Sequence, residues 1–268
     1  MLASVGGMRT ALVRRPGPRL ADGLVTHQER VPIDVDLAVV QWTAYVDALR
    51  VDGWEVVEVE PADECPDAVF VEDALVVFDD LAVVTRPGAE SRLAETAGAE
   101  AAARELGLDV HLIDEPVTLD GGDVLKVGRD VYVGIGGRTS PQAVAQLAVL
   151  LSPRGWIVRP VPVHRVLHLK SAVTALPDGT FVGFPDLVDD PTAFDPFRPV
   201  PEPAGAHVVV LGGDGGGDDA PGRLLMAADA PATAAAFRDD GYETVEVDIS
   251  EFEKLEGCVT CLSVRVRS

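Results

Sequence analysis

A glycine that ends a predicted helix and is followed by an apolar, strand-like run recurs along the chain. The pattern begins at Gly53, Gly107, Gly155, Gly205 and Gly241, and the copy at Gly205 is the weakest. Successive copies are 54, 48, 50 and 36 residues apart. A period of roughly 50 residues is typical of repeat architectures. Each repeat is predicted to hold a helix, a strand and then a pair of further strands.

A closed ring of five such units is the fold that this repeat favours. One helix with three short strands cannot bury its apolar face alone, whereas neighbours in a ring cover one another. We therefore predict an α/β fold, a five-bladed α/β propeller with pseudo-fivefold repeats. The alternative is an ordinary α/β sheet in which the glycines are coincidental. Hydrophobic residues make up 47% of the 268 and no linker divides them, so 1–268 is expected to be a single domain.

The elements of this ring are predicted from local patterns. Helices are expected within 36–51, 90–106, 142–151 and 232–240, where apolar residues recur at helical spacing. Strands are expected after the glycines and at 11–14, 68–71 and 81–85. Residues 186–203, rich in Pro and Asp, are expected to be an irregular connection, and the glycine-rich 212–222 a flexible loop.

The net charge of the chain limits the classes of partner that it can bind. Lys and Arg number 22 against 44 Asp and Glu, a formal net charge of −22. Such a field repels nucleic acid and anionic membranes but is compatible with a small cationic substrate. No apolar run approaches the roughly 18 residues of a membrane span, no secretory signal is recognised, and three cysteines do not make a disulfide framework. We therefore expect a protein of the reducing cytoplasm.

Two of the three cysteines stand together near the C-terminus, as Cys258-Val259-Thr260-Cys261. A thiolate is the best nucleophile among ordinary side chains once a neighbour activates it. The same spacing occurs in zinc sites and in redox dithiols. A zinc site needs two further soft ligands, and a redox motif should open a helix, whereas a strand pattern follows here. A pair of buried, inert cysteines stays open as the alternative.

Two candidate partners for such a thiolate stand far upstream in the sequence. His168 is a candidate proton carrier, and Asp120, which begins the motif Asp-Gly-Gly-Asp, is a candidate carboxylate beside it. A lone histidine is more often a satisfied core residue than a catalyst. His164 stands four residues before His168, but the strand-like pattern over 163–169 argues against the helical pair that a metal site would need.

A cluster of three carboxylates, Asp67, Glu72 and Asp73, surrounds Phe70 in a short apolar segment. The simplest interpretation is a solvated strand edge. Paired carboxylates beside an aromatic ring also fit a planar guanidinium, which takes bidentate acceptors and stacks on rings. The motifs of phosphate-binding loops and of serine-hydrolase elbows are absent from the sequence.

Six segments run in one order over nearly the whole chain: Phe70-Val71-Glu72-Asp73, 85–92, 119–124, Arg138-Thr139, 167–170 and 259–263. In this combination the chain resembles the dimethylarginine dimethylaminohydrolases of the guanidino-modifying, or pentein, superfamily. The resemblance implies a five-bladed α/β propeller with its active site on the central axis. His207 and the long segment 212–222 depart from the family pattern. Arginine deiminases and amidinotransferases share core residues but are typically longer, so the compact length favours the first family.

The resemblance also implies a role for each matching residue. Cys261, rather than Cys258, falls at the nucleophile, and His168 falls at the general acid and base. Asp120 falls at the acidic residue that supports this histidine. The implied substrate-binding residues are Leu24 in a covering loop, Asp67, Phe70, Glu72 and Asp73 around the guanidinium, and Arg92 and Arg138 at the substrate carboxylate.

The implied reaction is hydrolysis of an N-methylated arginine to citrulline through a thiouronium linked to Cys261. It needs no metal and no organic cofactor, the implied partner is a small cationic amino acid, and a homodimer is one possible assembly. An arginine deiminase or another guanidino-group enzyme is the alternative within the superfamily. An inactive acidic scaffold and a Cys258–Cys261 redox protein are the alternatives outside it.

Overall fold

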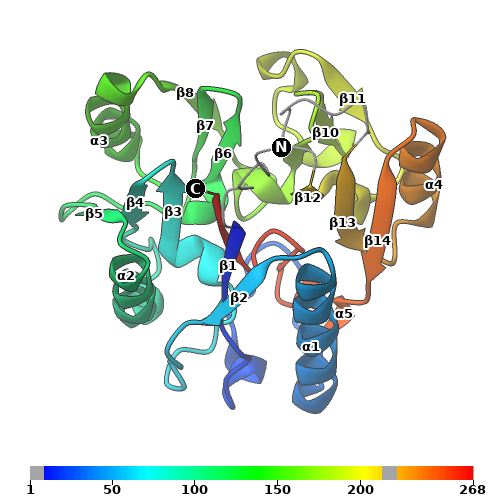
Figure 1. Ribbon diagram of the computed structural model, residues 1–268, viewed down its shortest axis with the longest axis horizontal. Helices are drawn as coiled ribbons and strands as arrows, with labels where there is room; N and C mark the ends of the chain where they lie inside the picture. Colours follow the sequence, from blue (N-terminus) through cyan, green and yellow to red (C-terminus); the bar gives the residue numbers. More distant parts are fainter. Residues whose placement is uncertain (1–8, 213–221, 268) are drawn as a thin grey trace, which may run out of the picture.

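The structure is a computed structural model that describes residues 9–212 and 222–267; the expected flexible loop 212–222 lies almost entirely outside the described residues. Within them, short strands form five sheets of three strands each, arranged around a common centre (Figure 1). In spatial order the sheets are β15 (Val264–Arg267), β1 (Arg9–Val13) and β2 (Glu55–Glu58); β3 (Leu75–Phe78), β4 (Leu81–Val84) and β5 (Asp109–Leu112); β6 (Val124–Val127), β7 (Asp130–Ile135) and β8 (Ile157–Pro162); β9 (Val173–Ala175), β10 (Phe181–Gly183) and β11 (Phe197–Pro199); and β12 (Val209–Gly212), β13 (Arg223–Ala227) and β14 (Glu243–Val247).

One connection pattern repeats in all five sheets. The first strand pairs antiparallel with the second, and the second pairs parallel with the third. In four sheets an α-helix joins the two parallel strands, as such a crossover requires. These helices are α1 (Val35–Val51), α2 (Thr96–Glu105), α3 (Pro141–Leu151) and α4 (Pro231–Asp239), and a short α5 (Ser250–Glu253) precedes β15. Because β15 pairs with β1, the two ends of the described chain close the ring, and the predicted five-bladed α/β propeller is confirmed.

The glycine repeat is confirmed at four positions and wrong at the fifth. Left-handed φ values of 84°, 76°, 80° and 94° occur at Gly53, Gly107, Gly155 and Gly241, as a helix end before a strand requires. Gly205 instead lies in a 3-10 turn, Pro203–Ala206, ahead of β12. The strand that should match the repeat is β11, which lies within the expected irregular connection and has no α-helix before it.

Two expected strand-like segments are also wrong. Residues 68–71 form turns that lead into a 3-10 helix over Val71–Ala74, and the strand starts only at Leu75. Residues 163–168 follow β8 without forming a strand. In this turn Asp73 pairs with Arg92 and Glu72 pairs with Lys170. These partners are distant in the sequence, so the local pattern does not indicate the turn.

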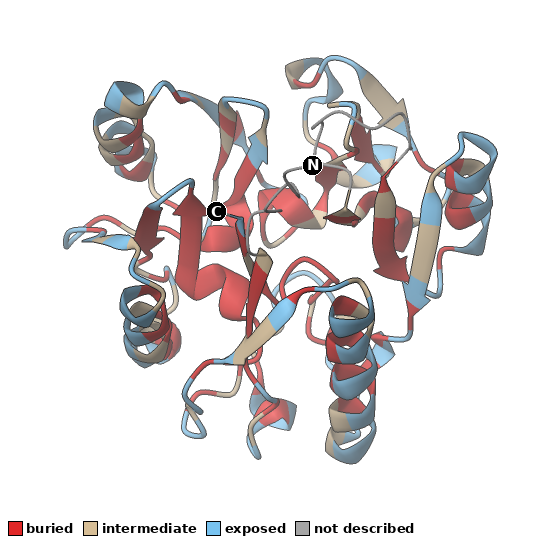
Figure 2. Cartoon of the chain, in the orientation of Figure 1, coloured by how far each residue is buried: buried red, intermediate tan, exposed pale blue. Residues whose placement is uncertain are grey.

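Burial falls from the centre of the ring outward (Figure 2). Every residue of β3 and β4 is buried, whereas the outer strands β2 and β5 hold exposed residues. A short irregular segment precedes the first strand of each sheet, and four of these segments carry predicted site residues: 67–73 before β3, 120–123 before β6, 168–171 before β9 and 258–261 before β15. In the described parts of the chain no helix has both the length and the apolarity to cross a bilayer.

Candidate active site

Three of these four segments, 67–73, 168–171 and 258–261, line one small cavity. It is lined by Leu24, Asp67, Phe70, Asp73, Arg92, Arg138, Leu167, His168, Leu255, Glu256, Gly257 and Cys261. These include every predicted site residue except Asp120 and Glu72. The open volume is about 20 Å³, room for roughly one water molecule. A ligand as large as an arginine therefore requires the covering residues to move.

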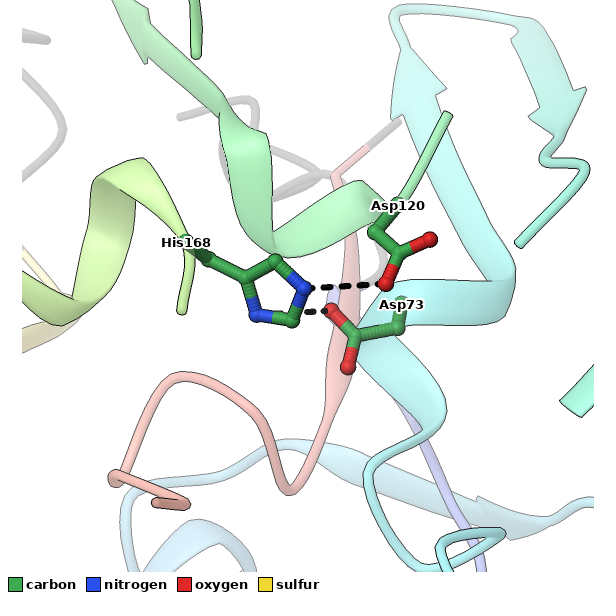
Figure 3. Close-up of side chains that lie close together, drawn as sticks. All are labelled: Asp73, Asp120 and His168. Carbon is green, nitrogen blue, oxygen red and sulfur yellow. Dashed lines mark hydrogen bonds and ion pairs between the residues drawn. The ribbon is translucent and has the colours of Figure 1, made fainter. Parts of the chain in front are cut away.

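The imidazole of His168 faces two carboxylates, those of Asp120 and Asp73, as Figure 3 shows. Its Nε2 donates to Asp120 Oδ2 over 2.9 Å, and its Nδ1 lies 3.8 Å from Asp73 Oδ1. Burial opposes the charged ring, but the charge of Asp73, the hydrogen bond to Asp120 and the charge of Asp123 outweigh it and raise the pKa of His168 to about 9. The imidazole is therefore protonated at neutral pH.

The glycine pair of the Asp-Gly-Gly-Asp motif makes this close approach possible. A Cβ on Gly122 would lie 2.6 Å from Asp73 Oδ1 and 2.7 Å from His168 Nδ1, so only a glycine fits there. The Gly122 amide also donates to Asp73 Oδ1 over 2.8 Å. Asp120, the first residue of the motif, accepts a second hydrogen bond, from the Gly88 amide, over 2.7 Å. The motif thus fixes both carboxylates that face the imidazole.

Asp123, the last residue of that motif, is a site residue that sequence reasoning missed. Its carboxylate accepts from the Leu169 amide over 2.9 Å and from Thr139 Oγ1 over 2.6 Å. Burial raises the pKa of Asp123 to about 6, although the charge of His168 and these hydrogen bonds lower it. Asp123 therefore positions the segment that carries the imidazole. Its place in the motif next to Asp120 was the available signal.

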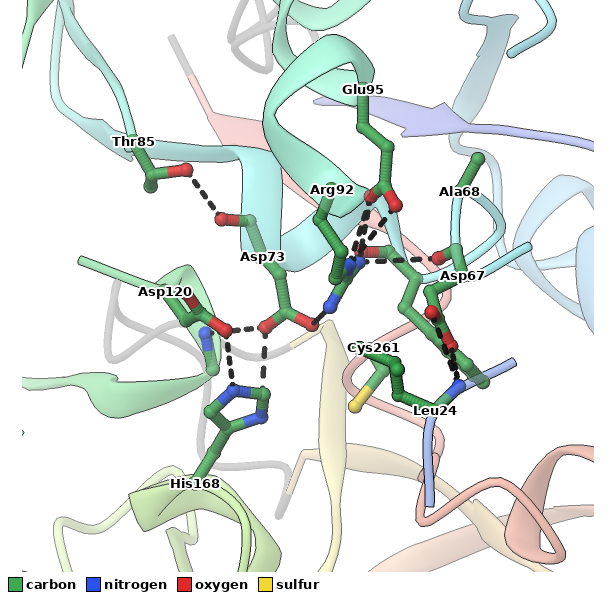
Figure 4. A network of polar contacts seen from close by, with 12 residues as sticks. Leu24, Asp67, Ala68, Asp73, Thr85, Arg92, Glu95, Asp120, His168 and Cys261 are labelled. Carbon is green, nitrogen blue, oxygen red and sulfur yellow. Dashed lines mark hydrogen bonds and ion pairs between the residues drawn. The ribbon is translucent and has the colours of Figure 1, made fainter. Parts of the chain in front are cut away.

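All three guanidinium nitrogens of Arg92 contact acceptors on the acidic side of the cavity (Figure 4). It is buried, its Nη1 donates to Asp73 Oδ2 over 2.6 Å, and its Nε and Nη2 donate to Glu95. The Nη2 also lies 3.2 Å from the carbonyl oxygens of Asp67 and Phe70. The donors that a substrate carboxylate would need are thus directed at this chain's own acceptors, and the predicted carboxylate-binding role of Arg92 stays a prediction.

Arg138 differs from Arg92 in its contacts. It is half-buried and lines the cavity, and within residues 9–212 and 222–267 its guanidinium has no hydrogen-bond or ion-pair partner. Its positive charge is close enough to Asp67 to lower the pKa of that carboxyl, against a larger opposing effect of burial. Of the two arginines predicted to bind a substrate carboxylate, Arg138 is the one with donors to spare.

Leu24 lines the cavity, and its segment is hydrogen-bonded to two acids. The Leu24 amide donates to both carboxylate oxygens of Asp67, over 3.0 and 3.2 Å. Glu256 accepts from the Thr26 amide over 3.1 Å and from the His27 amide. Hydrogen bonds therefore join the predicted covering segment to Asp67 and to Glu256. Sequence reasoning missed Glu256, and the covering role of Leu24 stays a prediction.

The two neighbouring thiols differ in what they face. Cys258 Sγ lies 3.4 Å from Cys261 Sγ and 3.2 Å from Thr260 Oγ1, but only Cys261 lines the cavity. The hydrogen bond with Cys258, burial and the charge of Asp73 raise the pKa of the Cys261 thiol. These neighbours therefore disfavour the thiolate form of Cys261.

Glu72 does not lie in this cavity. Its Oε1 is 2.6 Å from Lys170 Nζ and 3.4 Å from Arg265 Nη2, and it lines a different cavity further along the axis. Its Oε2 is buried and has no hydrogen-bond partner among the described residues. Its predicted contact with a guanidinium stays a prediction.

One group of side chains has the spacing of a metal site. Asp73, Asp120 and His168 present ligand atoms that all lie within 4.8 Å of one another. Asp73 is already paired with Arg92, and His168 is protonated and bonded to Asp120. A cation would have to displace that proton and compete with Arg92. The expectation that no metal is needed stays a prediction.

Five three-stranded sheets around an axis, with a thiol, an imidazole and paired carboxylates at one end, place the chain among guanidino-modifying proteins of the pentein fold. Residues 100–209 match the arginine deiminase family model. The chain is 62% identical to N(G),N(G)-dimethylarginine dimethylaminohydrolase of Streptomyces coelicolor over 97% of each chain. It is 31% identical to that of Pseudomonas aeruginosa, over 95% of this chain and 98% of the relative. The Pseudomonas aeruginosa protein complexed with citrulline superposes with a TM-score of 0.85 at 30% identity, over 96% of this chain and 99% of the other. The chain belongs to the dimethylarginine dimethylaminohydrolase family.

Proposed function

We propose that this protein hydrolyses asymmetric dimethylarginine and monomethylarginine to citrulline, with release of dimethylamine or methylamine. One observation carries the proposal: a single cavity joins the Cys261 thiol to the protonated His168, the carboxylate of Asp73 and the uncommitted guanidinium of Arg138. These are a nucleophile, a proton donor, an acceptor for a cation and a donor for a carboxylate. Membership of the family supports the same reaction.

The substrate binds with its two charged ends separated. The guanidinium group lies at the acidic side of the cavity, where Asp73 is fixed by Arg92, and the α-carboxylate pairs with Arg138. Leu24 closes over the ligand while its amide stays on Asp67. A planar cation held in this way presents its central carbon to Cys261.

The first half of the reaction releases the amine. The positive charge of the bound guanidinium lowers the pKa of the Cys261 thiol, which its neighbours otherwise raise. The thiolate attacks the guanidinium carbon, so that a C–S bond forms and a tetrahedral adduct results. The C–N bond to the methylated nitrogen then breaks, and His168 gives its proton to the departing amine. A thiouronium on Cys261 remains.

The second half needs the imidazole as a base. His168, now neutral, takes a proton from a water molecule as the oxygen attacks the thiouronium carbon. The C–S bond breaks and the hydroxyl proton of the adduct passes to the departing sulfur, so that citrulline leaves and the thiol and the protonated imidazole are restored. Asp120 keeps the ring in place through both halves of the reaction. Because its hydrogen bond occupies Nε2, Nδ1 is the nitrogen that gives and takes the proton.

Citrulline release from asymmetric dimethylarginine, monomethylarginine and arginine, assayed side by side without added metal, tests the proposal. We expect turnover of both methylated substrates. Because the arginine deiminase family model matches residues 100–209, the specific alternative is an enzyme that prefers unmodified arginine. Faster turnover of arginine would favour that alternative, and no citrulline from any of the three would reject both.

We further propose that residues 1–268 act as one catalytic domain in the cytoplasm, on a small cationic amino acid and as a homodimer. The continuous ring of five sheets supports the single domain. Light scattering on a sizing column would test the assembly, and a mass of one chain would reject the homodimer.

A further inference from the structure

Cys258 is a nucleophilic side chain that the proposed hydrolysis does not use. It is buried, and its Sγ lies 3.4 Å from the Sγ of Cys261. Both side chains are free thiols. Two thiols this close together form a disulfide when an oxidant reaches one of them, provided that the backbone allows the bond. The third cysteine, Cys65, is also a free thiol, but it does not line the cavity that holds Cys261.

The backbone between the two thiols is a tight turn. The Cys261 amide donates to the Cys258 carbonyl over 3.0 Å, which is the hydrogen bond of a four-residue β-turn. The Cα atoms at the two ends of such a turn are less than about 7 Å apart, and disulfides span about 4.4–6.8 Å between Cα atoms. A disulfide bond is about 2.0 Å long, so the two sulfurs need to approach by only about 1.4 Å. Rotation of the two side chains covers that distance.

The two thiols differ in access and in charge. Cys261 lines the active-site cavity, which has room for a molecule about the size of water, and hydrogen peroxide is only one oxygen atom larger. Cys258 does not line this cavity, and its Sγ lies 3.2 Å from Thr260 Oγ1. The hydrogen bond from Cys261 and the charge of His207 lower the pKa of Cys258 against the opposing effect of burial. The oxidant therefore meets Cys261, and Cys258 is the adjacent thiolate that attacks the product.

The oxidation runs in two steps on this pair. In the first step the proton shared by the two sulfurs lies on Cys258, and the Cys261 thiolate attacks one oxygen of hydrogen peroxide, so that the O–O bond breaks and hydroxide leaves. Cys261 is then a sulfenic acid. In the second step that hydroxide takes the proton of Cys258, whose thiolate attacks the Cys261 sulfur; the S–S bond forms, the S–O bond breaks and a second hydroxide leaves. The pair loses two electrons, and the peroxide gains them.

We propose that a peroxide converts Cys261 and Cys258 into a disulfide, and that Cys258 thereby protects the nucleophile from irreversible oxidation. A sulfenic acid with no thiol beside it goes on to a sulfinic acid, which thiols do not reduce. A disulfide returns to two thiols when a dithiol reduces it. The modification extends beyond the proposed hydrolysis, and only its effect on turnover rests on that function, because the disulfide occupies the attacking sulfur.

A mass map of the cysteines tests the proposal without any turnover assay. The folded protein is treated with excess hydrogen peroxide, its remaining thiols are alkylated, and it is digested with trypsin, which releases the peptide 255–265 by cleavage after Lys254 and Arg265. We expect this peptide to be unalkylated and lighter by two hydrogen atoms, while Cys65 is alkylated. Dithiothreitol should restore both thiols of the peptide.

Cys258→Ser compares the protected nucleophile with an unprotected one. Its Cys261 should be oxidised to the sulfinic or sulfonic acid. Its citrulline-forming activity should stay at least about tenfold reduced after dithiothreitol, whereas the unmodified protein should recover to within about twofold. Cys65→Ser is the matched control and should behave as the unmodified protein does. Melting temperatures show that both variants fold, and the mass map of the unmodified protein is decisive even if Cys258→Ser does not.

Four results would each overturn the proposal: a sulfinic acid on Cys261 in the unmodified protein, a disulfide to Cys65, full recovery of Cys258→Ser with dithiothreitol, or thiols that excess peroxide leaves unchanged. If the disulfide forms in a protein that releases no citrulline, the proposed function fails and the modification stands.

Discussion

The two ends of the propeller axis are built from the same strands but carry opposite charge. At one end, Asp73, Asp120 and Asp123 lie close to His168, and the cavity there is lined by Asp67 and Cys261. At the other end, the cavity that Glu72 lines, here called the rear cavity, has four basic side chains and one acid in its lining: Lys126, Lys170, Arg265, Arg267 and Glu72. The loops that precede the inner strands make the acidic end, and the strands themselves, through side chains such as Lys126, line the basic one.

What separates the two ends is a pair of neighbouring acids that face opposite ways. Asp73 turns to the acidic end and pairs with Arg92, whereas Glu72 turns to the rear cavity and pairs with Lys170. Both acids belong to the 3-10 turn over Val71–Ala74, and both are buried. The comparison teaches that one turn of backbone directs two neighbouring acids into two different cavities on the axis.

The sharpest way to break the comparison is to remove the nucleophile. We expect Cys261→Ser to lower turnover of dimethylarginine by about 10⁴-fold or more, because a hydroxyl is a far weaker nucleophile than a thiolate. Cys258→Ser is the matched control, since Cys258 does not line the cavity, and it should keep most of the activity. Steady-state citrulline release measures both. Equal loss in the two variants would mean that the thiols act as a unit.

The substitution Lys170→Met removes the ion pair with Glu72 that lies between the two cavities. This change leaves Glu72 with only the 3.4 Å contact to Arg265, and breaking a buried ion pair typically costs about 3–5 kcal/mol. We expect urea unfolding to report a loss of that order. Arg129→Met, which removes an exposed pair with Asp79, should cost less than about 1 kcal/mol. A similar small loss in both variants would show that Glu72 is neutral in the folded protein.

The acidic end should also make stability depend on pH. The folded protein raises the pKa of His168 to about 9, so the charged imidazole stabilises it fully below the ordinary value near 6.5. That contribution, on the order of 3 kcal/mol, is lost as pH rises from about 6.5 to 9.

Unfolding free energies of the unmodified protein and of His168→Gln, measured across that range, isolate the effect. Burial and the charge of Asp229 raise the pKa of Glu253 to about 8, so part of the decline below pH 8 is common to both proteins. Parallel curves for the two proteins would contradict a charged His168.

The smallest expected effect is a kinetic difference between variants of the two arginines, Arg92 and Arg138. Arg138→Ala should raise KM for dimethylarginine by about 10- to 150-fold, the equivalent of losing 1.5–3 kcal/mol of charged hydrogen bonding, with little change for a simple alkylguanidine. Arg92→Ala should impair both substrates, because it releases Asp73 and Glu95. Kinetics with the paired substrates give the split. If Arg92→Ala behaved like Arg138→Ala, Arg92 would contact the substrate carboxylate after all.

The sequence was sufficient where local chemistry decides the structure. The left-handed glycines predicted the repeat because few other residues adopt that backbone, and the Asp-Gly-Gly-Asp motif marked the segment beside His168. It was insufficient where neighbours distant in sequence decide. Nothing in the local sequence distinguishes Glu72 from Asp73. In the fold, however, Glu72 pairs with Lys170 and Asp73 pairs with Arg92.

The same reason explains two further failures. Arg92 and Arg138 look alike in sequence, but only Arg92 meets Asp73 and Glu95 in space. The rear cavity joins side chains from residues 72 to 267, and nothing in the local sequence around each of them indicates that they meet.

The measurement that tests the central claim most directly is a mass map of the thiols during turnover. His168→Gly lacks the group that protonates an amine, so S-methylthiocitrulline, whose thiolate departs without a proton, should still react with this variant and stall it as an adduct. Rapid quenching, digestion and fragmentation of the peptide 255–265, which contains both Cys258 and Cys261, locate the added mass. The account predicts one thiouronium adduct on Cys261, formed together with one equivalent of methanethiol. An adduct on Cys258, or thiol release without any adduct, would contradict it.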